Sequence, residues 1–563
     1  MKVLGISSGK GSGAAIMENG VILAAASEER FTRVKNDSSF PYKSLEFVLN
    51  ESNSKISDIG NIGVGCLHGV FTEYLPTVFE DIFKYLENDS KSVTNVKDKI
   101  VNSLKRDLEF RENFIKDMEE IGFKEDIITF YEHHTSHIST AFEPSPFEEA
   151  LVVTLDGRGD LKSGTVSIAS RKKGIQLLDS NNMLDSVGVF YGFITNYLGF
   201  KPNRHEGKVT GLAAYGDPSK ALPIMKKMIS YRDGRIFGNH GTNFTAWNTG
   251  RIPKIEELLA AFSKEDISAA AQFWMEEIVK VYITPYVKKY KIGNICLAGG
   301  IFANVKLNQR IREIEGVDNV FIFPGMTDVG NPIGGAYLKS IEIGQTISYP
   351  ITNVYWGPSY SDSEIEATLL QFSSDVEFEK IGPNKIKLAA KSIADGKVIG
   401  WFQGRMEYGP RALGTRSILV SAIDSKINKT INDRLNRTEF MPFAPVTLLE
   451  YAKESYIDWD ESHICNNFMT MCYDTTDFMD PTPAVIHVDG TARPQIIRKE
   501  DNPEYYGVLE EYHKITGIPT FVNTSFNNHE EPIICSPKDA VRSLIRDNVD
   551  ELYIGNFLVR VLK

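Results

Sequence analysis

The sequence predicts an α/β protein with more than one domain. It has 563 residues, and because a domain usually holds ~100–200 residues, we expect two to four domains. Residues 2–26 and 150–169 each read as a buried strand, a turn and a returning strand, so the first part of the chain is interpreted as a duplicated fold. A fresh α/β pattern begins after the polar, loop-like residues 343–364, where we place the domain boundary.

The opening elements are a buried run over residues 2–8 and a glycine-rich turn over 9–13. Asn19-Gly20 then stands between two strand-like runs, which predicts a hairpin, since a type I′ turn needs positive φ at both central positions. This order resembles the nucleotide-binding core shared by actin, hexokinase and Hsp70, in which the turn after the first strand faces phosphates. Further elements are expected as a helix over 268–290, strands over 294–298 and 319–323, a helix over 384–394 and a strand over 398–402.

Composition excludes several classes of protein. With 62 Lys+Arg against 74 Asp+Glu and a net charge of −12, the chain lacks the basic character of a dedicated nucleic-acid binder. Its five cysteines lie far apart without a C-x-x-C pair, so we expect no disulfide framework and no thiolate zinc site, which fits a reducing cytoplasm. The start does not read as a signal peptide. No segment reaches the ~20 apolar residues of a membrane helix, so we expect no membrane partner.

The sharpest chemical pattern is the histidine group at 133–137. His133 and His137 are spaced i, i+4, and in a helix both imidazoles would lie on one face, which suits a shared divalent metal. Asp156 and Asp328, both in loops at strand ends, could complete the site. No glutamate stands between the histidines as in H-E-x-x-H, so a zincin protease is a poor match. The alternative is that the histidines are ordinary surface or core residues.

A second pattern is the run 404–417, which carries Arg405, Arg411 and Arg416 among glycines. Guanidinium groups bind phosphate bidentately, and glycines let backbone N–H groups approach it, so the run predicts a phosphate site. A solvated charged loop is the alternative.

Two weaker patterns are polar turns. Residues 523–527 follow the strand 520–522, at a strand end where ligands commonly bind in α/β folds, although an Asx or Ser turn would look the same. Residues 204–216 place a charged group before a stretch of small residues, which a loop with a helix cap would also explain.

Taken together, these segments resemble the O-carbamoyltransferases of the nodulation-factor and antibiotic type, the group of the nebramycin, cephamycin and novobiocin enzymes. Several blocks in the right order are more specific than any one of them, and they span nearly the whole chain. The blocks are residues 28–33, 133–137, 155–157, 208–213, 297–304, 328–330, 404–414, 442–445, 487–493 and 523–527.

The resemblance implies two domains and a two-step reaction. Residues 1–350 would form an actin/Hsp70-like ATPase-fold domain similar to the TsaD-type transferases, and residues 360–563 a domain similar to the YrdC-type synthases. The second domain would consume carbamoyl phosphate and ATP, with Mg²⁺, to make carbamoyl-adenylate. The first domain, with a bound metal that is iron(II) or another divalent ion, would pass the carbamoyl group to a hydroxyl of a small natural product or sugar.

The resemblance also implies roles for residues at matching positions. The metal ligands would be His133, His137, Asp156 and Asp328. The nucleotide would be bound by Gly11, Gly157, Lys208, Gly299, Gly300 and Asn304. Carbamoyl phosphate and ATP would be bound by Arg405, Arg411, Arg416, Arg437, Arg493, Asn523 and Ser525.

Two departures from the family pattern concern catalysis. The usual opening carries a histidine that is a candidate base for the acceptor hydroxyl, and here Lys10 stands near the missing position. Lys10 could act as a base only with a lowered pKa, so phosphate binding is the preferred reading, and His134 is a second candidate base. Many members also carry a further basic residue near Met441, for which Arg434 and Arg437 could compensate.

Alternative functions are a tRNA-threonylcarbamoylation protein and a non-catalytic ATP-binding scaffold of the actin/Hsp70 type. The net charge of −12 argues against tRNA docking. The acceptor pocket is expected in the N-terminal domain along residues 68–122 and 230–262, and a homodimer is expected from base rates alone.

Overall fold

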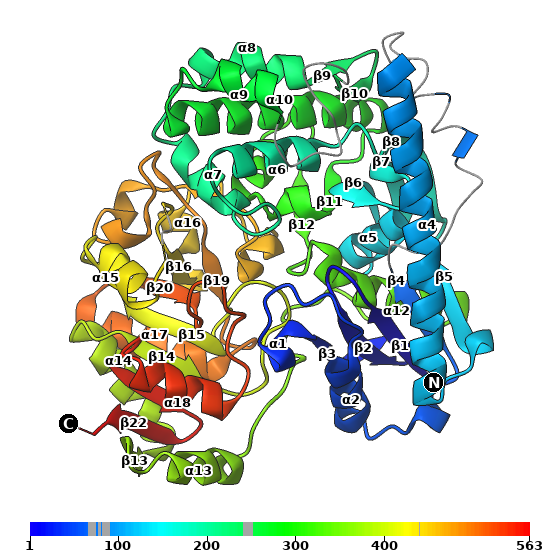
Figure 1. The fold of residues 1–563 in the computed structure, drawn as a ribbon. Helices are drawn as coiled ribbons and strands as arrows, with labels where there is room; N and C mark the ends of the chain where they lie inside the picture. Colours follow the sequence, from blue (N-terminus) through cyan, green and yellow to red (C-terminus); the bar gives the residue numbers. More distant parts are fainter. Residues whose placement is uncertain (66–74, 77–79, 81–89, 240–251, 438–439, 563) are drawn as a thin grey trace. The chain divides into compact units, whose positions relative to one another are not determined.

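The structure is a computed structural model that describes residues 1–563 except 66–74, 77–79, 81–89, 240–251, 438–439 and 563 (Figure 1). The predicted acceptor-pocket segments therefore lie partly outside the described residues. The chain forms two compact units. The first comprises Met1–Leu23, Ser38–Pro41 and Leu49–Pro350, and the second comprises Ala24–Asp37, Tyr42–Val48 and Ile351–Lys563.

The first unit contains two five-stranded sheets with the same strand order. One has the order β3-β2-β1-β4-β5 and the other β8-β7-β6-β11-β12. In each sheet the first strand pairs antiparallel with the next strand in sequence and parallel with the strand that follows the hairpin. The predicted duplication is thus confirmed, and with it the actin-like α/β fold class.

The strands of these sheets have the following bounds: β1 Lys2–Ser7, β2 Gly13–Glu18, β3 Val21–Ser27, β4 Ile62–Gly65 and β5 Ile128–Tyr131, then β6 Glu149–Gly159, β7 Lys162–Ser170, β8 Gly174–Asn182, β11 Asn294–Ala298 and β12 Asn319–Ile322. A separate hairpin pairs β9 Ile229–Arg232 with β10 Arg235–Gly238.

Two central helices, α5 (His133–Phe142) and α12 (Asn331–Glu342), pack against each other and connect the two sheets. Helix α12 contacts β1 and β4, while α5 contacts β6 and β11. Glycine is required at the crossing, because a Cβ at Gly334 would lie 2.3 Å from the Ser136 carbonyl oxygen. The other helices of this unit are α4 Ser90–Ile121, α6 Val187–Tyr197, α7 Glu206–Ala213, α8 Pro218–Met228, α9 Pro253–Leu259, α10 Lys264–Tyr290 and α11 Val305–Arg312.

Helix α10 begins four residues before the expected start at 268. The Ser263 side chain caps it by accepting a hydrogen bond from the Asp266 N–H at 3.1 Å. A capping serine is a local signal that the apolar pattern alone does not show.

The second unit is built on an eight-stranded mixed sheet of order β13-β22-β21-β14-β15-β20-β16-β19. Its strands are β13 Val376–Lys380, β14 Ile399–Phe402, β15 Arg416–Ser421, β16 Ala444–Leu448, β19 Gln495–Ile497, β20 Thr520–Ser525, β21 Glu551–Ile554 and β22 Phe557–Val561, with a small pair of β17 Tyr473–Asp474 and β18 Thr491–Ala492. Its helices are α1 Glu29–Thr32, α13 Asp362–Gln371, α14 Lys385–Ala394, α15 Ile427–Arg434, α16 Ala452–Ser455, α17 Pro503–Thr516 and α18 Pro537–Ile545, while α2 Tyr42–Glu51 lies mostly in it.

An early segment of the chain, Ala24–Asp37, is part of this second unit. The Arg30 guanidinium donates to the Gly409 carbonyl at 2.7 Å, and that of Arg33 donates to the Ile533 carbonyl at 2.7 Å. These partners lie hundreds of residues away, so the local pattern gave no sign of the placement.

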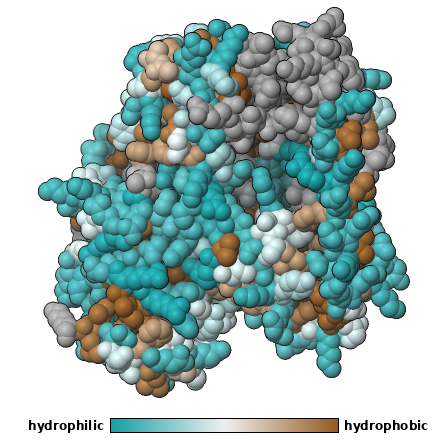
Figure 2. Space-filling model, viewed as in Figure 1, coloured by the Kyte–Doolittle hydropathy of each residue, from teal (hydrophilic) through white to brown (hydrophobic). Residues whose placement is uncertain are grey.

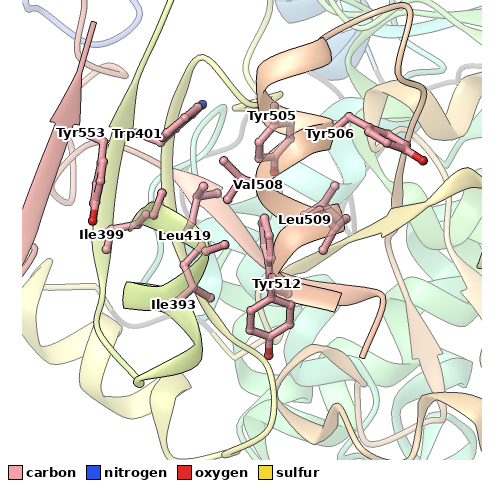
Figure 3. Packing of buried hydrophobic residues seen from close by; sticks show 14 of the residues in the cluster. Ile393, Ile399, Trp401, Leu419, Tyr505, Tyr506, Val508, Leu509, Tyr512 and Tyr553 are labelled. Carbon is pink, nitrogen blue, oxygen red and sulfur yellow. The ribbon is translucent and has the colours of Figure 1, made fainter. Parts of the chain in front are cut away.

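The core of the second unit lies between its sheet and the helices α14 and α17 (Figure 3). Trp401, Val508 and Leu509 are fully buried there, and Figure 3 shows Tyr505 and Tyr512 of α17 directed into the same cluster. Helix α17 is amphipathic, so burial of its apolar face fixes it on the sheet.

Figure 2 shows one face of the protein, on which hydrophilic residues predominate and apolar residues form small separate groups. Within the described residues, no helix combines the length and apolar character needed to cross a membrane.

Replacing Leu509 by Ala is expected to lower the free energy of unfolding of the second unit by about 2–5 kcal/mol, because the truncation leaves a cavity in a closely packed core. Leu370→Ala is the matched control, since Leu370 is 59% exposed on α13, and it should change the value by less than ~0.5 kcal/mol. Urea unfolding of both variants measures the difference, and equal effects would contradict this packing.

Candidate active site

Helix α5 carries the histidines of the predicted metal site. It begins after Glu132, whose carboxylate caps the helix by accepting the Thr135 N–H at 2.8 Å. His133 and His137 lie one turn apart, both fully buried, with ring centroids 4.5 Å apart. The helical i, i+4 arrangement expected from the spacing is therefore present.

Two carboxylates meet these imidazoles. Asp156 lies near the end of β6, and Asp328 begins the turn that follows β12. The His133 Nε2 atom lies 3.2 Å from Asp156 Oδ2 and 3.5 Å from Asp328 Oδ1, and the His137 Nε2 atom lies 3.5 and 3.4 Å from the same oxygens. We call His133, His137, Asp156 and Asp328 the His/Asp cluster; one ligand atom from each lies within 4.8 Å of the others.

The His/Asp cluster fits a single divalent ion. Ligands bound ~2.1 Å from one metal lie about 3.0–3.4 Å from their neighbours, close to the separations found here. Within the described part of the chain, the buried atoms His137 Nε2 and Asp328 Oδ1 have no hydrogen-bond partner. Two neutral imidazoles and two carboxylates suit several transition metals, iron(II) and zinc among them.

The imidazoles and carboxylates of the cluster shift one another's pKa values. Burial lowers the pKa of His137, but the carboxylates of Asp156 and Asp328 raise it by more, so that it lies at about 9. Burial raises the pKa of Asp156, but the two imidazoles outweigh this and hold the pKa well below its ordinary value. Without a metal ion the cluster therefore keeps a proton that offsets part of its negative charge.

Glycines bring backbone close to the Asp156 carboxylate and to the backbone of Asp328. The N–H groups of Gly157 and Gly300 donate to Asp156 Oδ1 at 2.6 and 3.3 Å. Gly299 has φ +104°, and a Cβ there would lie 2.2 Å from the Leu155 carbonyl oxygen. Gly11 has φ +74°, and a Cβ there would lie 2.3 Å from the Asp328 carbonyl carbon. The structure thus gathers these four predicted glycines around the His/Asp cluster.

The remaining predicted residues of the first unit lie in different settings. Lys10 is exposed and donates to Asn203 Oδ1 at 3.2 Å. Lys208 is buried on α7. Asn304 caps α11, and its side chain bonds to the Leu307 N–H, Gln272 and Thr210. These contacts position the Asn304 side chain at the start of α11, and its role in nucleotide binding stays a prediction.

The setting of His134, the second candidate base, does not favour that role. His134 is fully buried, with Nδ1 2.8 Å from Thr154 Oγ1. Burial and the neighbouring His133 lower its pKa to about 3, so it is a weak proton acceptor. His134 is adjacent in sequence to the predicted ligand His133, but its side chain is directed toward Thr154 of β6, which the sequence does not show.

In the second unit, the buried Glu407 organises the arginine-rich loop. Its carboxylate accepts the N–H groups of Leu413 at 2.7 Å and Arg416 at 3.2 Å. Sequence reasoning gave Glu407 no role. The signal available was a lone acidic residue within a run of arginines and glycines.

Arg416 does not fit the predicted anion-binding role. It is fully buried, and its guanidinium donates to the carbonyls of Gln403 at 2.8 Å and Pro358 at 2.9 Å and lies 3.7 Å from the centroid of the Phe402 ring. These carbonyls take up the Nη donors that phosphate would need, while the buried Nε atom has no hydrogen-bond partner among the described residues.

The strand end 523–527 lies beside this loop. β15 and β20 pair antiparallel, with Ser417 opposite Ser525. The Asn523 amide donates to the Ala412 carbonyl at 3.1 Å, while its buried Oδ1 has no hydrogen-bond partner among the described residues. Arg437 donates to Ser525 Oγ at 3.1 Å. The two predicted segments therefore form one region.

The other predicted arginines lie on the same loops. Arg405 donates to the Trp356 carbonyl at 2.7 Å and helps to fix the loop start. Arg411 and Arg493 are half-buried. Arg493 comes two residues before Gln495, which donates to the Leu413 carbonyl at 3.0 Å and accepts from Asn523 at 2.8 Å.

Both parts of the chain match models of one class of transferase. Residues 2–337 match the carbamoyltransferase N-terminus and residues 390–561 the carbamoyltransferase C-terminus. The chain therefore belongs to the carbamoyltransferase family, and it is an enzyme of the transferase class.

Two relatives that match nearly the whole of this chain support this family. Uncharacterized protein MJ1051 of Methanocaldococcus jannaschii is 34% identical, with 100% of both chains covered. Nodulation protein NolNO of Sinorhizobium fredii is 32% identical, covering 97% of this chain and 78% of its own. Among solved structures, T. kodakarensis HypF is 13% identical with a TM-score of 0.30, covering 62% of this chain and 48% of its own, a likeness too slight to carry an argument.

The metal-free protein is expected to lose stability as the pH rises. The pKa of His137 is raised from its ordinary value of 6.5 to about 9, so the stabilisation it gives is complete below about pH 6.5 and is lost as the pH rises through about 9. Melting temperatures of chelator-treated protein between these pH values measure the effect. His137→Gln should flatten this part of the profile, and an unchanged profile in that variant would contradict the assignment.

Proposed function

We propose that the chain is an ATP-dependent O-carbamoyltransferase that modifies a hydroxyl group of a small natural product or sugar. The observation that carries the proposal is the convergence of the His/Asp cluster in the unit that matches the carbamoyltransferase N-terminus. The arginine-rich loop and the strand end 523–527 in the other unit support a separate anion site.

The formation of carbamoyl-adenylate, the first step, would take place in the second unit. Carbamate is a poor electrophile, because its carbon is resonance-stabilised. Cleavage of carbamoyl phosphate by water leaves carbamate and phosphate, and a carbamate oxygen then displaces pyrophosphate from the α-phosphorus of ATP, bound with Mg²⁺. Arg411, Arg437 and Arg493 would bind the phosphate groups together with Ser525. The Asn523 Oδ1 atom, which has no hydrogen-bond partner among the residues described, would accept an N–H of the carbamoyl group.

The transfer of the carbamoyl group to the acceptor, the second step, would take place in the first unit. The acceptor oxygen attacks the carbamoyl carbon, the bond to the phosphate oxygen breaks, AMP leaves, and the hydroxyl proton passes to a base or to water. A divalent ion held by the His/Asp cluster would supply Lewis acidity next to the phosphate. The N–H groups of Gly157 and Gly300 hold the Asp156 carboxylate, and the positive φ of Gly11 and Gly299 lets backbone lie close to this region, where the adenylate would bind.

The test separates the two half-reactions. With carbamoyl phosphate, ATP and Mg²⁺, the protein should release pyrophosphate and form carbamoyl-adenylate, both detectable by coupled assay and mass spectrometry. No ATP-dependent consumption of carbamoyl phosphate would refute the proposal. A mass screen of hydroxylated acceptors, searching for a carbamoyl adduct, then identifies the acceptor.

Two variants should affect different steps. Arg411→Met is expected to slow pyrophosphate release at least ~10-fold, because a charged phosphate contact is lost. His137→Ala should leave pyrophosphate release within about twofold, since the two activities reside in different units, and abolish carbamoyl transfer. Arg546→Met is the matched control, since Arg546 is 60% exposed, and it should change neither step. Equal loss of pyrophosphate release in all three would contradict the assignment.

A further inference from the structure

The turn that follows β6 carries a carboxylate, that of Asp160, four residues after the cluster residue Asp156. Asp160 is only 7% exposed, and its Oδ2 accepts the backbone N–H of His133 at 2.8 Å. This N–H belongs to the first turn of α5, where no preceding helical carbonyl is available to it. Asp160 therefore satisfies a donor that belongs to a residue of the His/Asp cluster.

The carboxylates of Asp160 and Glu132 accept different backbone N–H groups of the first turn of α5. Glu132 accepts the Thr135 N–H at 2.8 Å, while Asp160 accepts the N–H of His133 itself. The side chain of Glu132 thus caps the helix at Thr135, and the N–H of His133 depends on Asp160. The contact of Asp160 adds a direct link between the helix and the loop that carries Asp156.

The same turn also fixes the imidazole ring of His133. A Cβ at Gly159 would lie 1.8 Å from His133 Cδ2, so the ring packs directly on this glycine. The backbone and the ring of His133 are therefore both held by residues 159–160. Asp156 lies three residues before Gly159, near the end of β6, and its Oδ2 atom is 3.2 Å from His133 Nε2.

We propose that Asp160 is a positioning residue that sets the place of His133 relative to Asp156 and thereby the metal affinity of the His/Asp cluster. This inference rests on the proposed function. Metal ligands need to be held to within ~0.5 Å, and a short segment that carries Asp156 and also holds the backbone of His133 provides such a constraint. Asp160 touches neither substrate nor the reacting atoms.

Two substitutions separate the hydrogen bond from the fold. Asp160 has φ +48°, a left-handed conformation that both glycine and asparagine tolerate, so neither variant adds backbone strain. Asp160→Gly removes the acceptor, whereas Asp160→Asn keeps an amide oxygen that can accept the His133 N–H. Cobalt(II) alone is the probe, because its visible absorption reports both affinity and ligand geometry without any turnover.

Asp160→Gly is expected to weaken cobalt binding at least ~10-fold and to change the shape of the visible band, while Asp160→Asn stays within about threefold of the wild type. Asp266→Gly is the matched control: Asp266 is 8% exposed and accepts the Asp217 N–H at 2.8 Å, and its loss should leave cobalt binding unchanged. Melting temperatures of all variants measure the structural cost separately.

If Asp160→Gly binds cobalt with the affinity and the visible spectrum of the wild type, the inference is overturned. A loss in Asp160→Asn as large as in Asp160→Gly would overturn it too, because the hydrogen bond would then not be the cause. A wild-type chain that binds no cobalt would instead overturn the metal proposal on which this inference rests.

Discussion

The approach of two carboxylates to two buried imidazoles constrains the whole first unit. Removing charged groups from water costs several kcal/mol for each ion unless a compensating charge is present. The raised pKa of His137, at about 9, is the metal-free form of that compensation. A divalent ion would replace the proton, and we regard this exchange as the reason why four polar side chains are gathered at one buried place.

The duplicated fold explains how distant residues reach this place. Asp156 lies near the end of β6 and Asp328 follows β12, two strands of one sheet, while α5 packs against that sheet. Loops at the carboxyl ends of such strands commonly bind ligands. Gly11, Gly299 and Gly300 allow the loops to approach one another there, because a Cβ at each would lie 3.0 Å or less from a neighbouring atom.

Much of the candidate site could be predicted where chemistry follows from local spacing or from strand ends. His133 and His137 are an example of the first, and the polar turn at 523–527 of the second. Local spacing and strand ends do not show which polar side chains become buried. Arg416 looks like a phosphate ligand in the sequence, but carbonyls from Gln403 and Pro358 surround it in the fold. The roles of Asp160 and Glu407 also depend on tertiary contacts, with the backbone of His133 and the N–H groups of 413–416.

The most direct measurement of the central claim is the metal content of the purified protein, determined by elemental analysis for the wild type and for Asp328→Asn. We expect about one divalent transition-metal ion for each wild-type chain and little in the variant, which loses one of two anionic ligands. A wild-type chain without such an ion, even after incubation with iron(II) under reducing conditions, or a variant that retains the full content, would contradict it.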